Sequence, residues 1–207
     1  MAAARAPSRP PIVGLLLAAG GSTRFRASTG RDKLAEPIPL GLPCAGIPVI
    51  AAALSALRPA VDEVVAVVDR DNRRAIGLIE ALGCIPLPCA SAGSGESIAL
   101  GVAARPDAFG WLVALGDMPF IRTATIRAVA KALESANLVA PVYRGRRGHP
   151  VGFGRIHAPA LLKLAGDEGA RAVLAASQPL LIETDDPGVV RDIDSPEDWK
   201  AAAGDAR

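Results

Sequence analysis

Apolar and polar positions alternate in two patterns along the first two thirds of this chain. Short apolar runs typical of buried strands occur at residues 12–18, 63–68, 84–87, 111–115 and 138–142. Between them, apolar residues recur at helical spacing over residues 47–57, 71–82, 96–104 and 123–135. Strands that alternate with helices in this way predict βαβ units and a mostly parallel sheet. Asp71 is expected to cap the second of these helices.

The last third of the chain is less regular. Residues 144–153 are rich in Gly and Arg and predict a loop or an irregular hairpin. Further predicted elements are helices at residues 158–164 and 168–176, a strand at 180–183 and a candidate strand at 189–193. The sequence DSPEDW begins a final helix, with Ser195 as N-cap and Pro196 in the first turn.

The domain organisation predicted from these patterns is simple. No internal repeat and no low-complexity linker divides the chain. We therefore expect a flexible tail over residues 1–11 and a single domain over residues 12–204. The N-terminal segment resembles a secretory signal, but Pro10 and Pro11 interrupt it, and its apolar part serves better as the first strand.

Composition narrows the class of protein. Half of the 207 residues are apolar but only 3% are aromatic, so the core is expected to consist of aliphatic side chains, as when helices pack on a parallel sheet. A net charge of +2 gives no argument for a nucleic-acid or membrane partner. Three cysteines without a CxxC spacing favour a reducing, cytoplasmic environment over a disulfide framework. No apolar run reaches the roughly 18 residues that span a bilayer.

The first predicted strand runs into the sequence LLLAAGGSTRF, which is a candidate anion-binding loop. Ligands of open α/β sheets bind beyond the carboxyl ends of the strands. The small residues at 18–21 would let backbone N–H groups approach an anion, and Ser22 and Thr23 add hydroxyl donors. Arg24 and Lys33 add positive charge that can pair with phosphates. A glycine turn with solvated basic side chains is the alternative on composition alone.

Acidic residues follow two other predicted elements. Asp117 comes directly after the buried run WLVALG and is placed to hold magnesium, which prefers carboxylates and phosphate oxygens. A turn aspartate that accepts backbone hydrogen bonds is the alternative. Asp192 and Asp194 lie two residues apart on an extended segment and therefore share a side, and Asp194 is a candidate second ligand. Stabilisation of the following helix dipole would equally explain these acids. Together, these parts suit phosphoryl-type transfer, which depends on positioning and charge neutralisation.

An ordered set of motifs resembles a known family. LAAGGSTRF, DKL, LGDMPFI, GRRGHPVGF, LAGDEGAR and DIDSPEDW, spread from about residue 12 to 199, are similar to the MobA-like nucleotidyltransferases, and within them to the molybdenum cofactor cytidylyltransferase type. The resemblance implies a Rossmann-like three-layer α/β/α sandwich with a mostly parallel mixed sheet, of the nucleotide-diphospho-sugar transferase type. It also implies transfer of CMP from CTP to the phosphate of molybdopterin, with release of pyrophosphate.

The resemblance also implies roles for single residues. Catalytic roles fall to Arg24, Lys33 and Asp117, and Mg²⁺ ligation to Asp117 and Asp194, with Asp192 as the fallback for the second ligand. The residues implied to bind the nucleotide are Leu17, Ala18, Ala19, Gly20, Gly21, Ser22, Gly95 and Ser97. Those implied to face the pterin acceptor are Gly148, His149 and Pro150. LAAG at residues 17–20, rather than LAGG, favours CTP over GTP.

One segment departs from the family pattern. RFRASTGRDKL inserts extra residues between Arg24 and Lys33, so a longer loop is expected there, and Arg31 is an alternative to Lys33 at the phosphates. The insertion keeps open a different phosphorylated acceptor, such as a sugar phosphate or methylerythritol phosphate. A non-catalytic carrier that delivers the molybdopterin cofactor to a molybdenum hydroxylase partner is the alternative from another class. The basic residues Arg144, Arg146 and Arg147 are either a solvated face or a clamp for an anionic acceptor.

Overall fold

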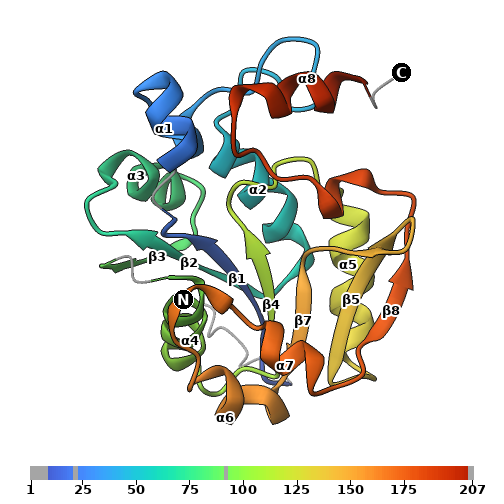
Figure 1. Ribbon diagram of the computed structural model, residues 1–207. Coiled ribbons are helices and arrows are strands. Elements are labelled where there is room, and N and C mark those ends of the chain that lie inside the picture. Colours follow the sequence, from blue (N-terminus) through green and yellow to red (C-terminus); the bar gives the residue numbers. More distant parts are fainter. Residues whose placement is uncertain (1–8, 21–22, 91–92, 205–207) are drawn as a thin grey trace, which may run out of the picture.

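The computed structural model describes residues 9–20, 23–90 and 93–204 (Figure 1). Its strands are β1 (Ile12–Ala18), β2 (Glu63–Asp69), β3 (Ile85–Cys89), β4 (Gly110–Leu115), β5 (Leu138–Tyr143), β6 (Arg146–Arg147), β7 (Val151–Gly154) and β8 (Leu180–Glu183). Its α-helices are α1 (Thr23–Thr29), α2 (Val49–Leu57), α3 (Arg73–Ala81), α4 (Ser94–Ala104), α5 (Thr123–Leu133), α6 (Ala158–Leu161), α7 (Arg171–Ala175) and α8 (Pro196–Gly204). None of these helices is long and apolar enough to cross a membrane.

The described strands form one mixed sheet. Their order is β3-β2-β1-β4-β7-β5-β6, and β8 also pairs with β5. Strands β1 to β4 run parallel to one another, whereas β7 is antiparallel to both β4 and β5. The chain moves outward from β1 to β3 and then returns to place β4 on the other side of β1. This reversal creates a topological switch point between the carboxyl ends of β1 and β4, which is where open α/β sheets bind their ligands.

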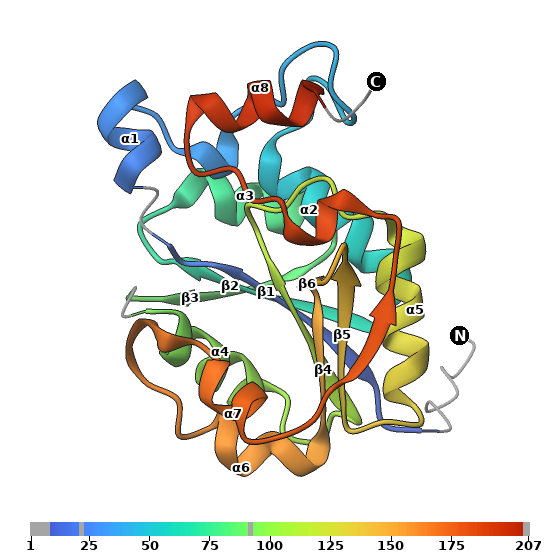
Figure 2. The same ribbon diagram turned by 45° about the vertical axis from the view of Figure 1, so that its right-hand side comes forward.

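Helices cover both faces of the sheet, so the predicted three-layer α/β/α architecture is confirmed (Figure 2). Successive side chains of β1 point to opposite faces. Leu16 and Ala18 belong to the core shared with α2, α3 and α5, whereas Val13 and Leu15 belong to the core shared with α4, α6 and α7. Both cores are aliphatic, and the buried Trp111 and Phe153 add aromatic bulk to the second.

Three local expectations were wrong. The cap of α3 is Asn72, whose side chain accepts a hydrogen bond from Ala75 N at 3.0 Å, rather than Asp71. Residues 189–193 do not form a strand, because the buried Asp186 accepts from Gly188 N and initiates a 3₁₀ helix, η5 (Pro187–Val190). The inserted segment after Arg24 forms the helix α1 rather than a loop.

The helix α1 has a clear stop signal that was not recognised in the sequence. Gly30 adopts φ = 70° directly after its last residue, and its N–H donates to Arg26 O at 2.8 Å. A glycine with positive φ at this point is a common way to end a helix. The insertion is therefore a short, locally stabilised element.

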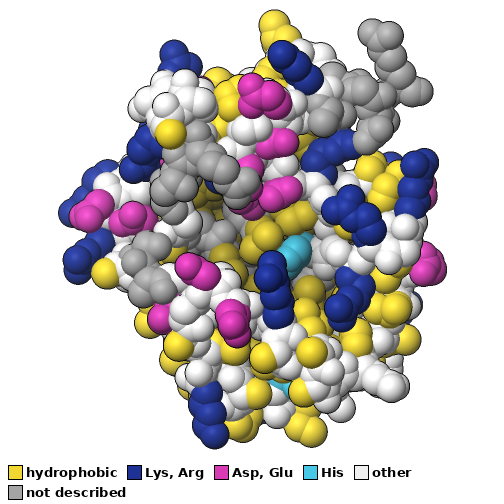
Figure 3. All heavy atoms as spheres, viewed as in Figure 1, with side chains coloured by type: hydrophobic (Ala, Val, Ile, Leu, Met, Phe, Trp, Pro, Cys, Tyr) yellow, Lys and Arg dark blue, Asp and Glu magenta, His cyan; other side chains and the backbone are white. Residues whose placement is uncertain are grey.

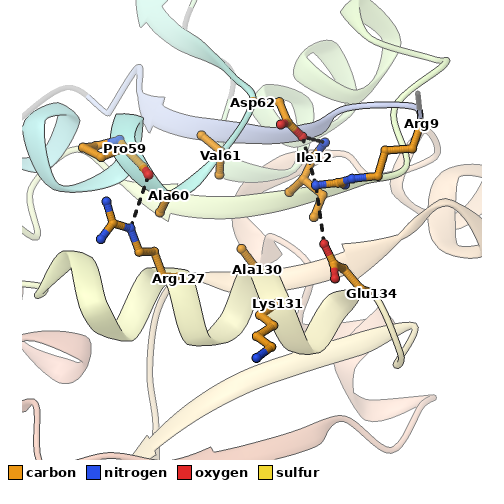
Figure 4. Close-up of a pocket in the computed structure, with 10 residues that line it drawn as sticks. All are labelled: Arg9, Ile12, Pro59, Ala60, Val61, Asp62, Arg127, Ala130, Lys131 and Glu134. Atoms are coloured by element: carbon orange, nitrogen blue, oxygen red, sulfur yellow. Dashed lines mark hydrogen bonds and ion pairs between the residues drawn. The ribbon is translucent and has the colours of Figure 1, made fainter. Parts of the chain in front are cut away.

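The chain enters the sheet through residues 9–11, which precede β1. Arg9 makes ion pairs with Asp62 at 3.7 Å and Glu134 at 3.4 Å, at the rim of a hollow of about 280 Å³ (Figure 4). The same Asp62 accepts a hydrogen bond from Ile12 N at 2.8 Å. This hollow lies at the amino end of β1, so it is separate from the switch point. The division into a tail and one domain stays a prediction, and residues 1–8 lie outside the described residues.

Candidate functional site

The ends of β1 and β4 bring two of the predicted segments together. Gly116 N donates to Leu17 O at 2.9 Å directly after β4. A Cβ atom at residue 116 would lie 3.2 Å from that same oxygen, so the close approach of the two strands favours glycine. Asp117 therefore follows β4 immediately beside the loop that follows β1.

Lys33 bridges the two acids that were proposed as metal ligands. Its Nζ donates to Asp117 Oδ2 at 2.8 Å and to Asp194 Oδ1 at 2.7 Å. The whole residue is only 7% exposed. Asp117 and Asp194 are 84 and 161 positions away from Lys33 in the chain, and the three residues form one compact charged cluster.

Local hydrogen bonds fix Lys33 in this position. It begins the 3₁₀ helix η1 (Lys33–Ala35), whose N-cap is Asp32. One carboxylate oxygen of Asp32 accepts from Leu34 N at 3.2 Å, and the other accepts from Asn72 Nδ2 at 2.6 Å. The residue before Lys33 is therefore anchored to the start of α3, which limits the range of positions that the lysine can reach.

Asp194 is held beside Asp117 by the backbone. Ile193 N donates to Asp117 O at 2.9 Å. Asp198 Oδ2 accepts from Asp194 N at 2.8 Å and from Ser195 N at 2.7 Å, which is the reciprocal half of a capping box at the start of α8. Two acids of DIDSPEDW thus have different roles: Asp198 caps the helix, whereas Asp194 contacts Lys33.

The charges of the cluster are interdependent. Burial alone would lower the pKa of Lys33, but the charge of Asp117 and hydrogen bonds to both carboxylates outweigh it and raise that pKa. Asp192 lies close enough for its pKa to be raised by removal from water and by the like charges of Asp194 and Asp117. Asp194, rather than Asp192, is the acid that shares the Lys33 ammonium group with Asp117.

The donor set fits a divalent cation of the magnesium type. Asp117 Oδ1 is buried and has no hydrogen-bond partner among the described residues. The same residues contain no cluster of three or more His, Cys, Asp or Glu placed to ligate a metal. Mg²⁺ is usually held by one or two carboxylates together with substrate phosphates and water, so two aspartates are sufficient.

The loop after β1 is described only in part. Leu17 lines a cavity, Ala18 and Ala19 are buried, and Gly20 is exposed with open space where a Cβ atom would project. Gly21 and Ser22, as well as the side chain of Arg24, lie outside the described residues. Arg31, the alternative to Lys33, is 69% exposed and pairs with Glu36 at 3.2 Å, so it does not reach the two aspartates.

Gly95 and Ser97 take part in packing at the start of α4. A Cβ atom at residue 95 would lie 2.7 Å from Ala165 O, so Gly95 allows the segment at 165–168 to lie directly on the helix. Ser97 is buried and its hydroxyl donates to Gly93 O at 2.9 Å within the helix. Ser97 therefore lies inside the first turn, because α4 begins at Ser94 rather than at the expected residue 96.

The three residues expected at the acceptor lie beside a cavity of about 370 Å³. Gly148 and His149 line it, and Figure 3 shows a histidine at the bottom of a hollow on this face with basic side chains next to it. Gly148 N donates to Pro141 O at 2.9 Å and His149 N to Val189 O at 2.8 Å, which fixes the backbone. Pro150 is buried and follows a cis peptide bond.

Removal from water favours the neutral form of His149 in this cavity. Its Nδ1 lies 3.4 Å from Val113 O. Removal from water lowers its pKa, although the Val113 carbonyl and the charges of Asp117 and Asp192 oppose this effect. A neutral imidazole can accept a hydrogen bond as well as donate one, which suits a polar but uncharged part of a ligand.

One important supporting residue was missed in the sequence. Asp186 is 1% exposed and accepts from Arg122 N and Thr125 Oγ1, both at 2.8 Å, as well as from Gly188 N at 3.0 Å. It thereby fixes η5, whose Val189 carbonyl holds His149. The sequence DDPG is a turn signal that could have indicated this role.

Comparison with known proteins identifies the family. Residues 14–180 match the model of the MobA-like NTP transferase domain. The chain belongs to this family. The purine catabolism protein PucB of Bacillus subtilis (strain 168) is 30% identical over 206 residues, which cover 92% of this chain and 95% of PucB. The family is one of nucleotidyltransferases, so the resemblance seen in the sequence is confirmed at this level, whereas the cytidylyltransferase subtype is not.

More distant proteins share part of the sequence or only the fold. The bifunctional protein GlmU of Clavibacter sepedonicus is 29% identical over 170 residues, and this chain spans about a third of its length, 31%. The structure of Rv0371c from Mycobacterium tuberculosis H37Rv has a TM-score of 0.75 at 24% identity, with 93% of this chain and 98% of that chain covered. A second structure of Rv0371c is a complex with manganese, with a TM-score of 0.70.

Proposed function

We propose that this protein transfers CMP from CTP to the phosphate of molybdopterin and releases pyrophosphate. The observation that carries the proposal is the bridge from Lys33 Nζ to Asp117 and Asp194 at the switch point of the sheet. A cation-binding acid pair next to an amide-rich loop is the arrangement that nucleotidyl transfer requires, because the reaction depends on charge neutralisation and positioning.

The proposed metal-binding residues are Asp117 and Asp194. A bound Mg²⁺ would supply charge neutralisation of the triphosphate and polarise its α-phosphoryl group. The buried, unpartnered Oδ1 of Asp117 supports this assignment. The manganese complex of Rv0371c, a protein of the same fold, agrees with a divalent cation.

The remaining residues bind and orient the substrates. Backbone amides after β1, together with Arg24 and Lys33, stabilise the triphosphate and the leaving pyrophosphate. A phosphate oxygen of the acceptor attacks the α-phosphorus, and the bond to the bridging oxygen of the pyrophosphate breaks. No protein nucleophile is required, because the attacking oxygen already carries negative charge.

Two observations support the choice of substrates. The sequence LAAG at residues 17–20 favours CTP by resemblance to the cytidylyl-transferring members of the family. PucB, which is similar over nearly its whole length, is a purine catabolism protein. A partner that oxidises purines, such as a molybdenum hydroxylase of the xanthine dehydrogenase kind, would agree with that name. A sugar phosphate or methylerythritol phosphate acceptor, or a carrier role without catalysis, are the alternatives.

Thermal unfolding with CTP, GTP, UTP and ATP, each with and without magnesium, tests the nucleotide. A ligand at about 100 times its Kd should stabilise the fold by roughly 2.7 kcal/mol. We expect a magnesium-dependent shift that is largest for CTP. Release of pyrophosphate in the presence of molybdopterin then tests the acceptor. A shift with CTP but no release with molybdopterin would contradict the proposed acceptor, and a larger shift with GTP or ATP would contradict the proposed nucleotide.

A further inference from the structure

The cavity beside His149 has an apolar floor at the carboxyl ends of β1 and β4. Leu17 and Leu115 come from the carboxyl ends of β1 and β4, and Val113, Val151 and Phe153 extend the floor across β4 and β7. Leu115 precedes Asp117 by two residues. A molecule in this cavity would therefore lie at the carboxyl ends of β1 and β4, close in the chain to the proposed metal-binding Asp117, which is a suitable place for an acceptor.

Two arginines from different elements line the same cavity without a partner. Arg147 belongs to β6 and Arg171 begins α7. Neither guanidinium makes a hydrogen bond or an ion pair with any residue that the structure describes, although Asp167 and Glu168 line the cavity as well. By contrast, Arg105 is paired with Glu63. Unpaired guanidinium groups at a cavity are available to bind an anion.

The geometry of the β5–β6 hairpin directs Arg147, but not Arg144 or Arg146, toward the cavity. Arg147 pairs with Val142 across the hairpin. Consecutive strand residues point to opposite faces, so Arg146 is directed away from the side that carries Arg147. The guanidinium carbon of Arg144 lies 5.2 Å from the centre of the Tyr143 ring, in a cation–π contact. Among these three, Arg147 alone lines the described cavity.

The segment that leads to Arg171 is fixed on α4. Ser94 Oγ donates to Asp167 O at 3.0 Å, and Gly93 and Gly95 leave room for the backbone of residues 165 and 166. This anchoring holds the start of α7 at the cavity that Arg147 of the hairpin lines as well. The cavity is therefore flanked by one cation from each of two separately anchored elements.

We propose that Arg147 and Arg171 bind an anionic group of the acceptor while its ring system packs on the apolar floor. This inference rests on the proposed function, because it assigns the cavity to the acceptor of the transfer reaction. It requires an acceptor with a flat, weakly polar part and negative charge. Guanidinium groups suit such an anion because their paired N–H donors match the oxygens of a phosphate or a similar oxyanion. The two arginines thus select the acceptor and leave the nucleotide to the loop after β1.

Steady-state kinetics of pyrophosphate release test this assignment. Arg147→Gln and Arg171→Gln should each raise the KM for molybdopterin by about tenfold, the factor that corresponds to 1.4 kcal/mol. The KM for CTP should stay within about twofold, because the triphosphate lies at the other end of the site. Arg146→Gln is the matched control, since it removes the same charge from the adjacent residue outside the cavity. A rise in the KM for CTP instead, or an unchanged KM for molybdopterin, would overturn the assignment.

Inorganic phosphate separates this inference from the proposed function. If the wild-type protein does not use molybdopterin, the proposed acceptor is wrong, but the arginines can still be tested by thermal unfolding. We expect millimolar phosphate, with CTP and magnesium present, to raise the Tm of the wild type and of Arg146→Gln more than that of the double variant Arg147→Gln/Arg171→Gln. Equal shifts in all three proteins would refute an anion site formed by the two arginines.

Discussion

Replacing Lys33 by methionine should weaken the fold and strengthen metal binding at the same time. The substitution keeps the length and the apolar stem of the side chain but removes its ammonium group. It leaves the carboxylates of Asp117 and Asp194 next to each other without the cation that now bridges them. Two like charges then face each other in a largely buried site, which costs stability.

The distances in the cluster give the size of this effect. At 2.7 and 2.8 Å, each ion pair corresponds to about 6 kcal/mol at an effective dielectric constant near 20, before the cost of removing the charges from water. Loss of one partner of a buried pair costs about 3–5 kcal/mol. Because the Asp117 and Asp194 side chains are 23% and 26% exposed, water compensates part of that loss. We therefore expect Lys33→Met to lower the free energy of unfolding by about 2–3 kcal/mol in EDTA.

Magnesium should reverse most of this loss. A divalent cation no longer competes with the ammonium group for the two carboxylates in the variant, so its affinity should rise by about tenfold, equivalent to 1.4 kcal/mol. Turnover should nevertheless fall by about 100-fold, because the positive charge that stabilises the leaving pyrophosphate is gone.

Urea denaturation in EDTA and in magnesium, followed by calorimetric titration of the metal, measures both quantities. Arg31→Gln is the control. It removes a positive charge only two residues before Lys33, and the side chain of Arg31 is 69% exposed. The reasoning fails if Lys33→Met is as stable as the wild type in EDTA, or if its affinity for magnesium decreases.

Four further substitutions extend these expectations. Asp117→Asn should reduce pyrophosphate release by about 10³-fold with an unchanged circular dichroism spectrum, because it removes a proposed metal ligand. Arg31→Gln should keep its turnover within about twofold in the same assay, since its side chain is remote from the cluster. Asp186→Ala leaves three donors without an acceptor and should lower the Tm by about 6–12 °C, equivalent to roughly 3 kcal/mol. Burial would raise the pKa of Asp198, but hydrogen bonds from residues 194 and 195 outweigh this effect and lower that pKa. Its contribution is complete above the unfolded pKa of about 3.9 and is lost as the pH falls through the lower folded value, so Asp198→Asn should flatten the acid limb of stability against pH.

The strands β1, β2, β4, β5 and β8 could be predicted from the sequence because they are largely apolar runs. The short strand β7 was not predicted, because its sequence VGFG lies mostly in the Gly- and Arg-rich segment that was expected to be a loop or irregular hairpin. The limits of β1 and β8 were predicted to the residue, since a proline precedes each run and Gly20 or Asp185 lies two residues after its end. The region at 189–193 was not, because a buried acid at position 186 determines a 3₁₀ helix there and overrides the apolar composition of the segment. Helix α1 was missed because its residues have no apolar stripe, and its stop signal at Gly30 was read as part of a loop.

The sequence indicated the two acids of the charged cluster as candidate site residues, but it did not indicate the contacts between them and Lys33. The spacing of Asp117 after a buried strand, and of Asp194 before a helix, indicated both acids. That Lys33 would lie between them could not be predicted, because its position depends on the hydrogen bond from Asn72 to Asp32, which joins residues 40 positions apart. Likewise, Arg171 carries no local signal, since its place at the cavity follows from the packing of residues 165 and 166 on the glycines of α4.

The bridge between Lys33 and Asp194 has a consequence for synthesis of the protein on the ribosome. The two residues are 161 positions apart, so at about 5–20 residues per second the second aspartate emerges about 8–32 s after the lysine. Strands β1 to β4 can pair during that interval, and Lys33 can then contact Asp117 alone. The nascent chain therefore carries an incomplete charged cluster, and the proposed activity would begin only when the segment around α8 has been translated and has docked.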